Sequence, residues 1–247
     1  MRISTRLLIA LCLSGATSAA ALAGPVEDGV AAYDRADYAE ALRLFGPLAA
    51  QGNAVAQNYI GNLYYGGLGV AKDSAKALHW YRLAAAQGLS DAQGNVGNMY
   101  LNGFGVAKNS GEALRWLRLS AAQGNAGAQV KIGSMYENGF GVAKNFAEAL
   151  RWYRLSAAQG NGLAQSLLGL MYYQGEGVAE DDAEAFRFLG LAAVQGYAAA
   201  QFIVGVMYEN GEGTTGDAAE ALRWYRLAAA QGDADAVKAV ERLTNGN

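Results

Sequence analysis

Few side chains in this sequence could take part in covalent chemistry. Its 247 residues include one histidine, His79, and one cysteine, Cys12. Histidine supplies general bases, and cysteine supplies nucleophiles and metal ligands. One of each is too few for a disulfide framework or a Cys/His zinc site, and a serine nucleophile would have no evident base.

Two glycine-rich runs superficially suggest a phosphate-binding loop. Residues 67–72 read Gly-Leu-Gly-Val-Ala-Lys, and residues 103–108 read Gly-Phe-Gly-Val-Ala-Lys. A Walker-type loop ends in Gly-Lys-Ser/Thr and follows a strand, and neither feature is present. The carboxylates Asp181, Asp182 and Glu184 stand at a predicted helix start, where capping explains them. We therefore expect no catalytic residue, cofactor or metal site, and predict loop glycines with positive φ at two places.

The segments that carry these motifs are copies of one unit. Glutamine, glycine and tyrosine residues each recur at intervals of 36. They form the columns Gln57, Gln93, Gln129, Gln165 and Gln201; Gly61, Gly97, Gly133, Gly169 and Gly205; and Tyr64, Tyr100, Tyr136, Tyr172 and Tyr208. The five copies span residues 53–88, 89–124, 125–160, 161–196 and 197–232. Because one copy cannot bury its apolar faces alone, the copies must stack into a solenoid.

Each copy is predicted to fold as two helices. In the first copy, the apolar spacing predicts helix A over residues 54–65 and helix B over residues 74–87. Asn or Asp stands before every helix B, and copies two to five place Glu three residues later, as in a capping box. A glycine closes each copy, Gly88 in the first, where a left-handed residue is expected after the helix.

Gly61 and its equivalents fall inside helix A, where glycine costs about 1 kcal/mol relative to alanine. Such a cost should recur only where another group approaches closely. We expect that group to be a column of large aromatic side chains on helix B. This column is Trp80, Trp116, Trp152, Phe188 and Trp224.

Helix B also carries two columns of basic residues. His79 belongs to a column that is otherwise arginine, which is typical of a solvated helix face, and the glutamates three residues earlier can pair with these arginines. A second arginine column is interrupted by Gly190. It is either a basic ridge for an acidic partner or a self-compensated convex face. The two columns are His79, Arg115, Arg151, Arg187 and Arg223; and Arg82, Arg118, Arg154 and Arg226.

Two shorter segments complete a single repeat domain, predicted over residues 24–247. Residues 26–52 form a related helix pair with a shorter loop. Residues 233–244 form a last helix whose polar residues suit a C-terminal cap. With two helices for each pair and one for the cap, the sequence predicts 13 helices.

The unit resembles the Sel-1-like repeat, a relative of the tetratricopeptide repeat with a longer loop. The resemblance rests on Ala-Gln-x3-Gly-x2-Tyr-x2-Gly-x-Gly-Val and then Ala-x2-Trp-Tyr-Arg-x-Ala-Ala-x-Gln-Gly, as in residues 56–88. The pair at 26–52 looks more like a tetratricopeptide unit. The resemblance implies an all-α fold, a right-handed α-α superhelix that serves as a protein-interaction adaptor. The partner that this role implies is another protein or a peptide segment. Bacterial members of the family are often exported.

The first 23 residues have the composition of a secretory signal peptide. Arg2 and Arg6 precede an apolar run, and Ala21-Leu22-Ala23 fits a cleavage site before Gly24. No later segment is predicted to span the membrane, so we expect a periplasmic protein, with secretion as the alternative. The net charge of −3 offers no basic face for nucleic acid.

The binding surface is predicted from helix A positions that vary among the copies. These positions lie opposite the core, and in tetratricopeptide-like solenoids the A helices line the concave surface. They change from polar to apolar along the chain. The predicted partner-binding residues are Tyr59, Asn62, Asn95, Asn98, Lys131, Leu167, Leu170, Tyr173, Phe202, Ile203 and Val206. The apolar end would anchor an amphipathic partner helix, or would be covered by helix 234–243 or by a dimer mate.

Three classes of function follow, of which a non-catalytic, regulatory interaction adaptor in the periplasm is favoured. A secreted protein that binds a host protein is the second. The third is an enzyme acting on peptidoglycan or a β-lactam. The relatives described as β-lactamase-like are rich in cysteine, whereas this chain has none after residue 23, so the resemblance does not extend that activity to it.

Overall fold

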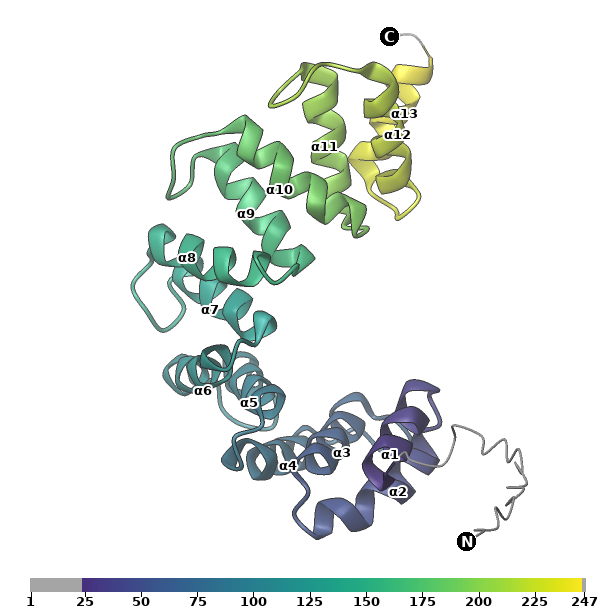
Figure 1. Ribbon diagram of the computed structural model, residues 1–247, viewed down its shortest axis with the longest axis vertical. Helices are drawn as coiled ribbons and strands as arrows, with labels where there is room; N and C mark the ends of the chain where they lie inside the picture. Colours follow the sequence, from purple (N-terminus) through teal and green to yellow (C-terminus); the bar gives the residue numbers. More distant parts are fainter. Residues whose placement is uncertain (1–23, 246–247) are drawn as a thin grey trace, which may run out of the picture.

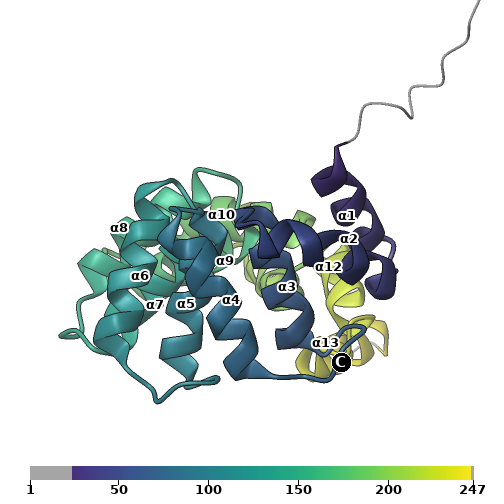
Figure 2. The same cartoon turned by 90° about the horizontal axis from the view of Figure 1, so that it is seen from below.

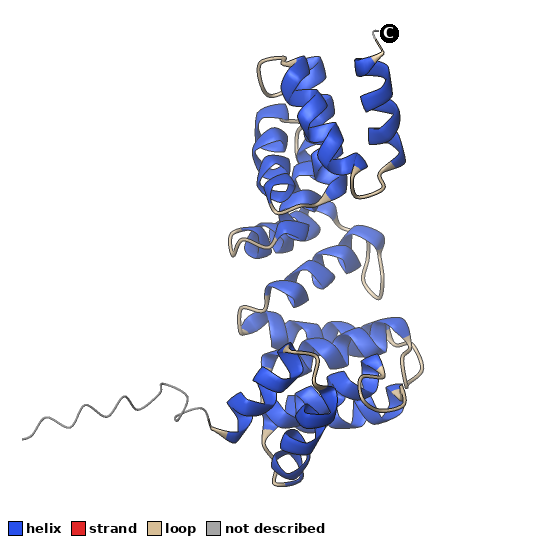
Figure 3. Cartoon of the chain, turned by 90° about the vertical axis from the view of Figure 1, so that its right-hand side faces the viewer, coloured by secondary structure: helices blue, strands red, loops and turns tan. Residues whose placement is uncertain are grey.

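A computed structural model describes residues 24–245, which form 13 α-helices joined by turns and loops (Figures 1 and 3). The predicted all-α fold and number of helices are confirmed for these residues. The predicted signal peptide, residues 1–23, lies outside the described residues.

The helix boundaries follow the repeat closely. The N-terminal pair is α1 (Pro25–Asp34) and α2 (Tyr38–Ala50). The A helices are α3 (Ala54–Gly66), α5 (Ser90–Asn102), α7 (Ala126–Asn138), α9 (Gly162–Gln174) and α11 (Ala198–Asn210). The B helices are α4 (Ser74–Ala86), α6 (Ser110–Ala122), α8 (Phe146–Ala157), α10 (Asp182–Val194) and α12 (Ala218–Ala229). The last helix is α13 (Ala234–Thr244).

The helix pairs stack into a right-handed α-α superhelix. Almost all contacts between helices join neighbours in chain order, as expected for a solenoid. Figure 1 shows an arc that is open on its right, with α5 on the inner side and α6 on the outer side. The two ends of the arc, α1–α2 and α12–α13, lie on the same side of the molecule (Figures 1 and 2).

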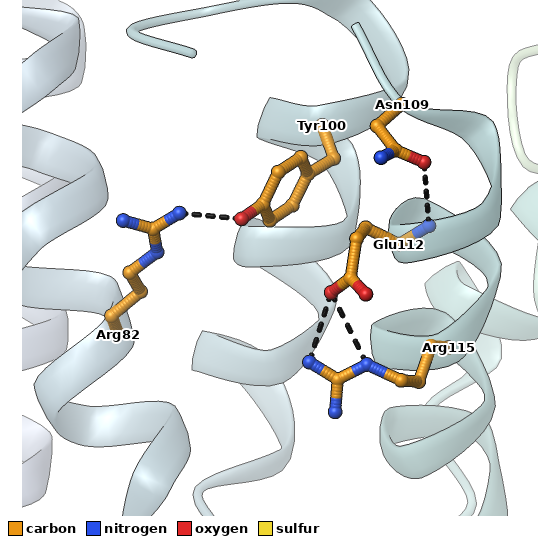
Figure 4. A network of polar contacts seen from close by, with 5 residues as sticks. All are labelled: Arg82, Tyr100, Asn109, Glu112 and Arg115. Carbon is orange, nitrogen blue, oxygen red and sulfur yellow. Dashed lines mark hydrogen bonds and ion pairs between the residues drawn. The ribbon is translucent and has the colours of Figure 1, made fainter. Parts of the chain in front are cut away.

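Each B helix starts with half of a capping box. The Asn109 side chain accepts a hydrogen bond from the Glu112 N–H at 3.0 Å (Figure 4). The other half is missing, because the Asn109 N–H donates to the carbonyl of Tyr100 at 2.9 Å. The Glu112 carboxylate is therefore free to pair with Arg115, also at 2.9 Å.

The column that requires glycine in helix A is not the tryptophan column, so that prediction was wrong. A Cβ at Gly133 would lie 2.5 Å from the ring of Tyr153. The residue in contact is the one after each Trp or Phe: Tyr81, Leu117, Tyr153, Leu189 or Tyr225. One residue turns a helix face by about 100°, so Trp152 points elsewhere and packs against the cluster formed by α6 and α7.

The loop glycines have a structural role. Gly67 and Gly69 both have positive φ, +69° and +68°, as the sequence predicted. A Cβ at Gly69 would also lie 2.9 Å from the Cβ of Tyr38 in the preceding helix pair. The Gly-x-Gly motif thus makes a tight turn and lets each loop dock closely on the preceding unit.

Candidate interaction groove

A groove of about 530 Å³ crosses the inner face of the first repeats. Its wall comes from α1, α3, α5, α7 and the turns that precede α5 and α7. The lining residues are Val30, Val55, Asn58, Tyr59, Asn62, Leu89, Asp91, Gly94, Asn95, Asn98, Asn125, Gly127, Ala128 and Lys131. Five of the predicted partner-binding residues are among them: Tyr59, Asn62, Asn95, Asn98 and Lys131.

Asparagines along this groove take part in three separate polar contacts. Asn95 Nδ2 donates to Asn58 Oδ1 at 3.1 Å, which links α5 to α3. The Tyr81 hydroxyl donates to Asn62 Oδ1 at 2.8 Å. Asn102 Nδ2 donates to Asn98 Oδ1 at 2.9 Å, one turn along the same helix. The amide oxygens of these asparagines are thereby held in fixed orientations.

Tyr59 forms a rigid wall at the N-terminal end of the groove. Its ring stacks on Phe45 with centroids 4.8 Å apart and meets the edge of Tyr33 at 5.0 Å. Burial raises the pKa of the Tyr59 hydroxyl, and the carboxylates of Asp34 and Asp91 add to this effect. The hydroxyl is therefore neutral at physiological pH, and Tyr59 offers a contact surface rather than a charge.

Lys131 brings a positive charge into the groove. Its side chain is half-buried, and this desolvation lowers the pKa of its ammonium group below the ordinary value. None of the ion pairs among residues 24–245 includes Lys131.

The other six predicted residues lie apart from this groove and are half-buried. Leu167, Leu170, Tyr173 and Ile203 pack against the core cluster formed mainly by α8 to α11. Phe202 and Val206 belong to a cluster with Val240 and Leu243 of α13. The terminal helix thus packs against part of the apolar end. This was one of the alternatives to a partner helix at that end. The predicted residues divide into a polar groove and an apolar, largely packed segment.

The outer face is occupied by contacts within the protein. His79 is exposed and lies edge-on to Trp80, with ring centroids 5.5 Å apart. The arginines equivalent to His79 pair with glutamates three residues earlier. Arg118 donates to the Tyr136 hydroxyl of the next repeat at 2.9 Å, and Figure 4 shows the same contact between Arg82 and Tyr100. These contacts support the self-compensated convex face over the basic ridge.

Some groove residues were not singled out from the sequence. Asp91 stands in the same column as Val55, 36 residues later, and its carboxylate accepts from Asn125 Nδ2 at 2.9 Å. The period could have revealed Asp91. Val30 belongs to the N-terminal pair, which departs from the period, so only the structure places it in the groove.

The described residues contain neither a group of three or more potential metal ligands nor a helix long and apolar enough to cross a membrane. The fold and the groove define the chain as an α-solenoid of repeated helix pairs. The Sel1 repeat model matches residues 17–53, 54–89, 90–125, 126–161, 162–197 and 198–233, so the chain belongs to the Sel1 repeat family. The first match includes the pair at 26–52. Sel1 repeats mediate interactions between proteins.

Solved structures show the same architecture. A Sel1 repeat protein from Oxalobacter formigenes is 38% identical, with a TM-score of 0.79, over 90% of this chain and 88% of that one. A protective antigen of uropathogenic Escherichia coli with an SLR fold is 36% identical, with a TM-score of 0.75; the alignment covers 79% of this chain but only 42% of that one. An immunity protein from Pseudomonas aeruginosa, 22% identical over 89% of this chain and 87% of that one, shares the fold (TM-score 0.56). The comparison with curated proteins finds no match.

Proposed function

We propose that this chain is an exported, non-catalytic scaffold that binds a segment of another protein along its inner groove. The observation that carries the proposal is the groove from α1 to α7, which is built mainly from positions that vary among the repeats. The positions that do not vary are used for packing, capping and turns. Its volume of about 530 Å³ lies within the range of about 300–1,000 Å³ that is common for ligand sites.

Export is supported by the basic residues, apolar run and small-x-small site in residues 1–23. The description of one relative as a protective antigen is compatible with it. We infer a periplasmic location, and we keep a secreted protein that binds a host protein as the second candidate. Fractionation separates them, because the second predicts the mature protein in the culture medium.

An enzymatic function has less support. His79 is exposed on the outer face, away from the groove. The titratable groups in the groove, Asp91, Tyr59 and Lys131, form no pair within hydrogen-bond distance that would resemble a nucleophile and its base. Activity on peptidoglycan or a β-lactam that disappeared in a His79→Ala variant would favour the enzyme instead.

Affinity capture with a matched pair of variants tests the scaffold proposal. Residues 24–247 serve as bait in envelope extract, beside Asn98→Arg in the groove and Leu119→Arg on the outer face of the same repeat. Leu119 is 43% exposed and Asn98 is half-buried in the groove wall, so the melting temperature of each variant shows whether the fold accommodates the arginine. We expect a partner that Leu119→Arg retains and Asn98→Arg loses, at equal melting temperatures. A partner lost only with Leu119→Arg would contradict the proposal.

A further inference from the structure

The inner groove is rich in hydrogen-bond donors that lack acceptors. Three of its asparagines use their side-chain oxygens to accept bonds from other residues. Their Nδ2 groups donate to no acceptor among residues 24–245, although each carries two N–H donors. These asparagines are Asn58, Asn62 and Asn98. Asn58 as a whole is 7% exposed, but among residues 24–245 the buried polar atoms without partners are the indole nitrogens of Trp152 and Trp224. The free Nδ2 of Asn58 therefore reaches the surface of the groove, where an acceptor on a ligand can meet it.

Lys131 adds a charged donor to this set. It stands 36 residues after Asn95 in the same column, on the next A helix. A half-buried ammonium group without a counter-ion has lost solvation that no ion pair among residues 24–245 restores. A carboxylate on a ligand would restore it, through a charge-assisted hydrogen bond of the stronger kind.

The balance of charges limits the kind of ligand. Of the described residues that line the groove, Lys131 is the one cation and Asp91 is the one carboxylate. Asp91 already accepts from Asn125. A polyanion such as nucleic acid would meet one lysine and one repelling carboxylate. A ligand with carbonyl oxygens and a single acidic group matches the groove better.

We propose that the groove binds an extended peptide segment whose Asp or Glu side chain pairs with Lys131. The backbone carbonyls of this segment accept hydrogen bonds from Asn58, Asn62 and Asn98. An extended segment exposes its carbonyl groups, whereas a helix uses them internally. This inference rests on the proposed function, and it names the chemistry of the partner segment.

Selection from a random peptide library displayed on phage, with residues 24–247 as bait, tests the inference. We expect enriched peptides to share an acidic residue. Lys131→Met should weaken a synthetic peptide of that sequence about tenfold, as for the loss of one charge-assisted hydrogen bond. Lys131→Glu should enrich basic residues at the same position. Lys108→Glu is the matched control, because Lys108 is an exposed loop lysine outside the groove, and it should leave the selection unchanged.

Asn98→Asp provides a second test, because it replaces an N–H donor by an acceptor of the same shape. It should weaken the acidic peptide more than Asn98→Ala does. Peptides that bind equally well to the Lys131 and Asn98 variants would overturn the inference but leave the scaffold proposal standing. A selection that enriches nothing would overturn both. Thermal unfolding of each variant shows that lost binding does not reflect lost folding.

Discussion

At the scale of residues, the repeated residues serve helix packing or hydrogen bonding between helices. Gly133 leaves room for Tyr153, whose ring is fully buried. Gln129 is 5% exposed, and its Oε1 accepts from Gln159 Nε2 at 2.8 Å. Its own Nε2 donates to the carbonyl of Ala121. A buried amide that is satisfied on both sides ties neighbouring helices together.

Two glycine variants separate packing from helix propensity. Gly133→Ala should lower the free energy of unfolding by about 1–3 kcal/mol, because its Cβ meets the ring of Tyr153. Gly190→Ala should raise it by up to about 1 kcal/mol, because this helical glycine has no atom within 4 Å of the added Cβ. Urea unfolding measures both. A stabilised Gly133→Ala would contradict the close contact.

Gln129→Leu should lower the free energy of unfolding by about 1–3 kcal/mol, because it removes both hydrogen bonds of a buried amide, the one from Gln159 Nε2 and the one to the Ala121 carbonyl. Gln159→Leu is the comparison: Gln159 is exposed, and its loss removes the bond to Gln129 Oε1 but leaves the bond from Gln129 to Ala121 in place, so it should cost less. If the two changes lowered the free energy of unfolding equally, the second hydrogen bond of the buried Gln129 amide would make no measurable contribution to stability.

At the scale of elements, the final helix is held by a small polar network. Arg242 of α13 forms an ion pair with Glu209 of α11, and the Tyr225 hydroxyl donates to the same carboxylate at 2.8 Å. The hydrogen bond from Arg242, with a further contribution from Tyr225, lowers the pKa of Glu209. The network fixes α13 over the end of the solenoid, where Phe202 and Val206 would otherwise lack cover.

This network predicts a pH dependence. A carboxylate with a lowered pKa stabilises the folded state above its ordinary pKa, and the contribution disappears as the pH falls through the lowered value. Arg242→Gln should therefore reduce stability at pH 7 and have progressively less effect as the pH falls below about 4.5. Urea unfolding of both proteins across this range measures the difference. A difference that is constant with pH would exclude the ion pair as its cause.

Much of the architecture was predictable because one period appears five times. The helix limits, caps and left-handed glycines are local properties, and each recurs in the sequence. The partner of the helix A glycine was not predictable, because adjacent columns hold Trp152 and Tyr153 and both are large and aromatic. The extent of the groove was equally hidden, since Leu167 and Ile203 are apolar whether they bind a partner or pack inside.

At the scale of the whole molecule, contacts between successive helices hold the arc together. Deletion of residues 125–160 joins Gly124 to Asn161, which occupies the same place in the repeat as Asn125. The shortened chain should fold with the same helicity per residue and a somewhat lower melting temperature. Deletion of residues 125–154 breaks the period and should reduce helicity and cooperativity. Circular dichroism compares the two, and equal loss of structure would contradict the modular account.

The central claim is that partners bind on the inner face of the arc. A photocrosslinking amino acid placed at Asn95, and separately at Leu119, tests it in intact cells. The account predicts a crosslinked partner from Asn95, on the inner face, and none from Leu119, on the outer face. A partner crosslinked from Leu119 alone would contradict the claim and direct attention to the convex surface of the B helices.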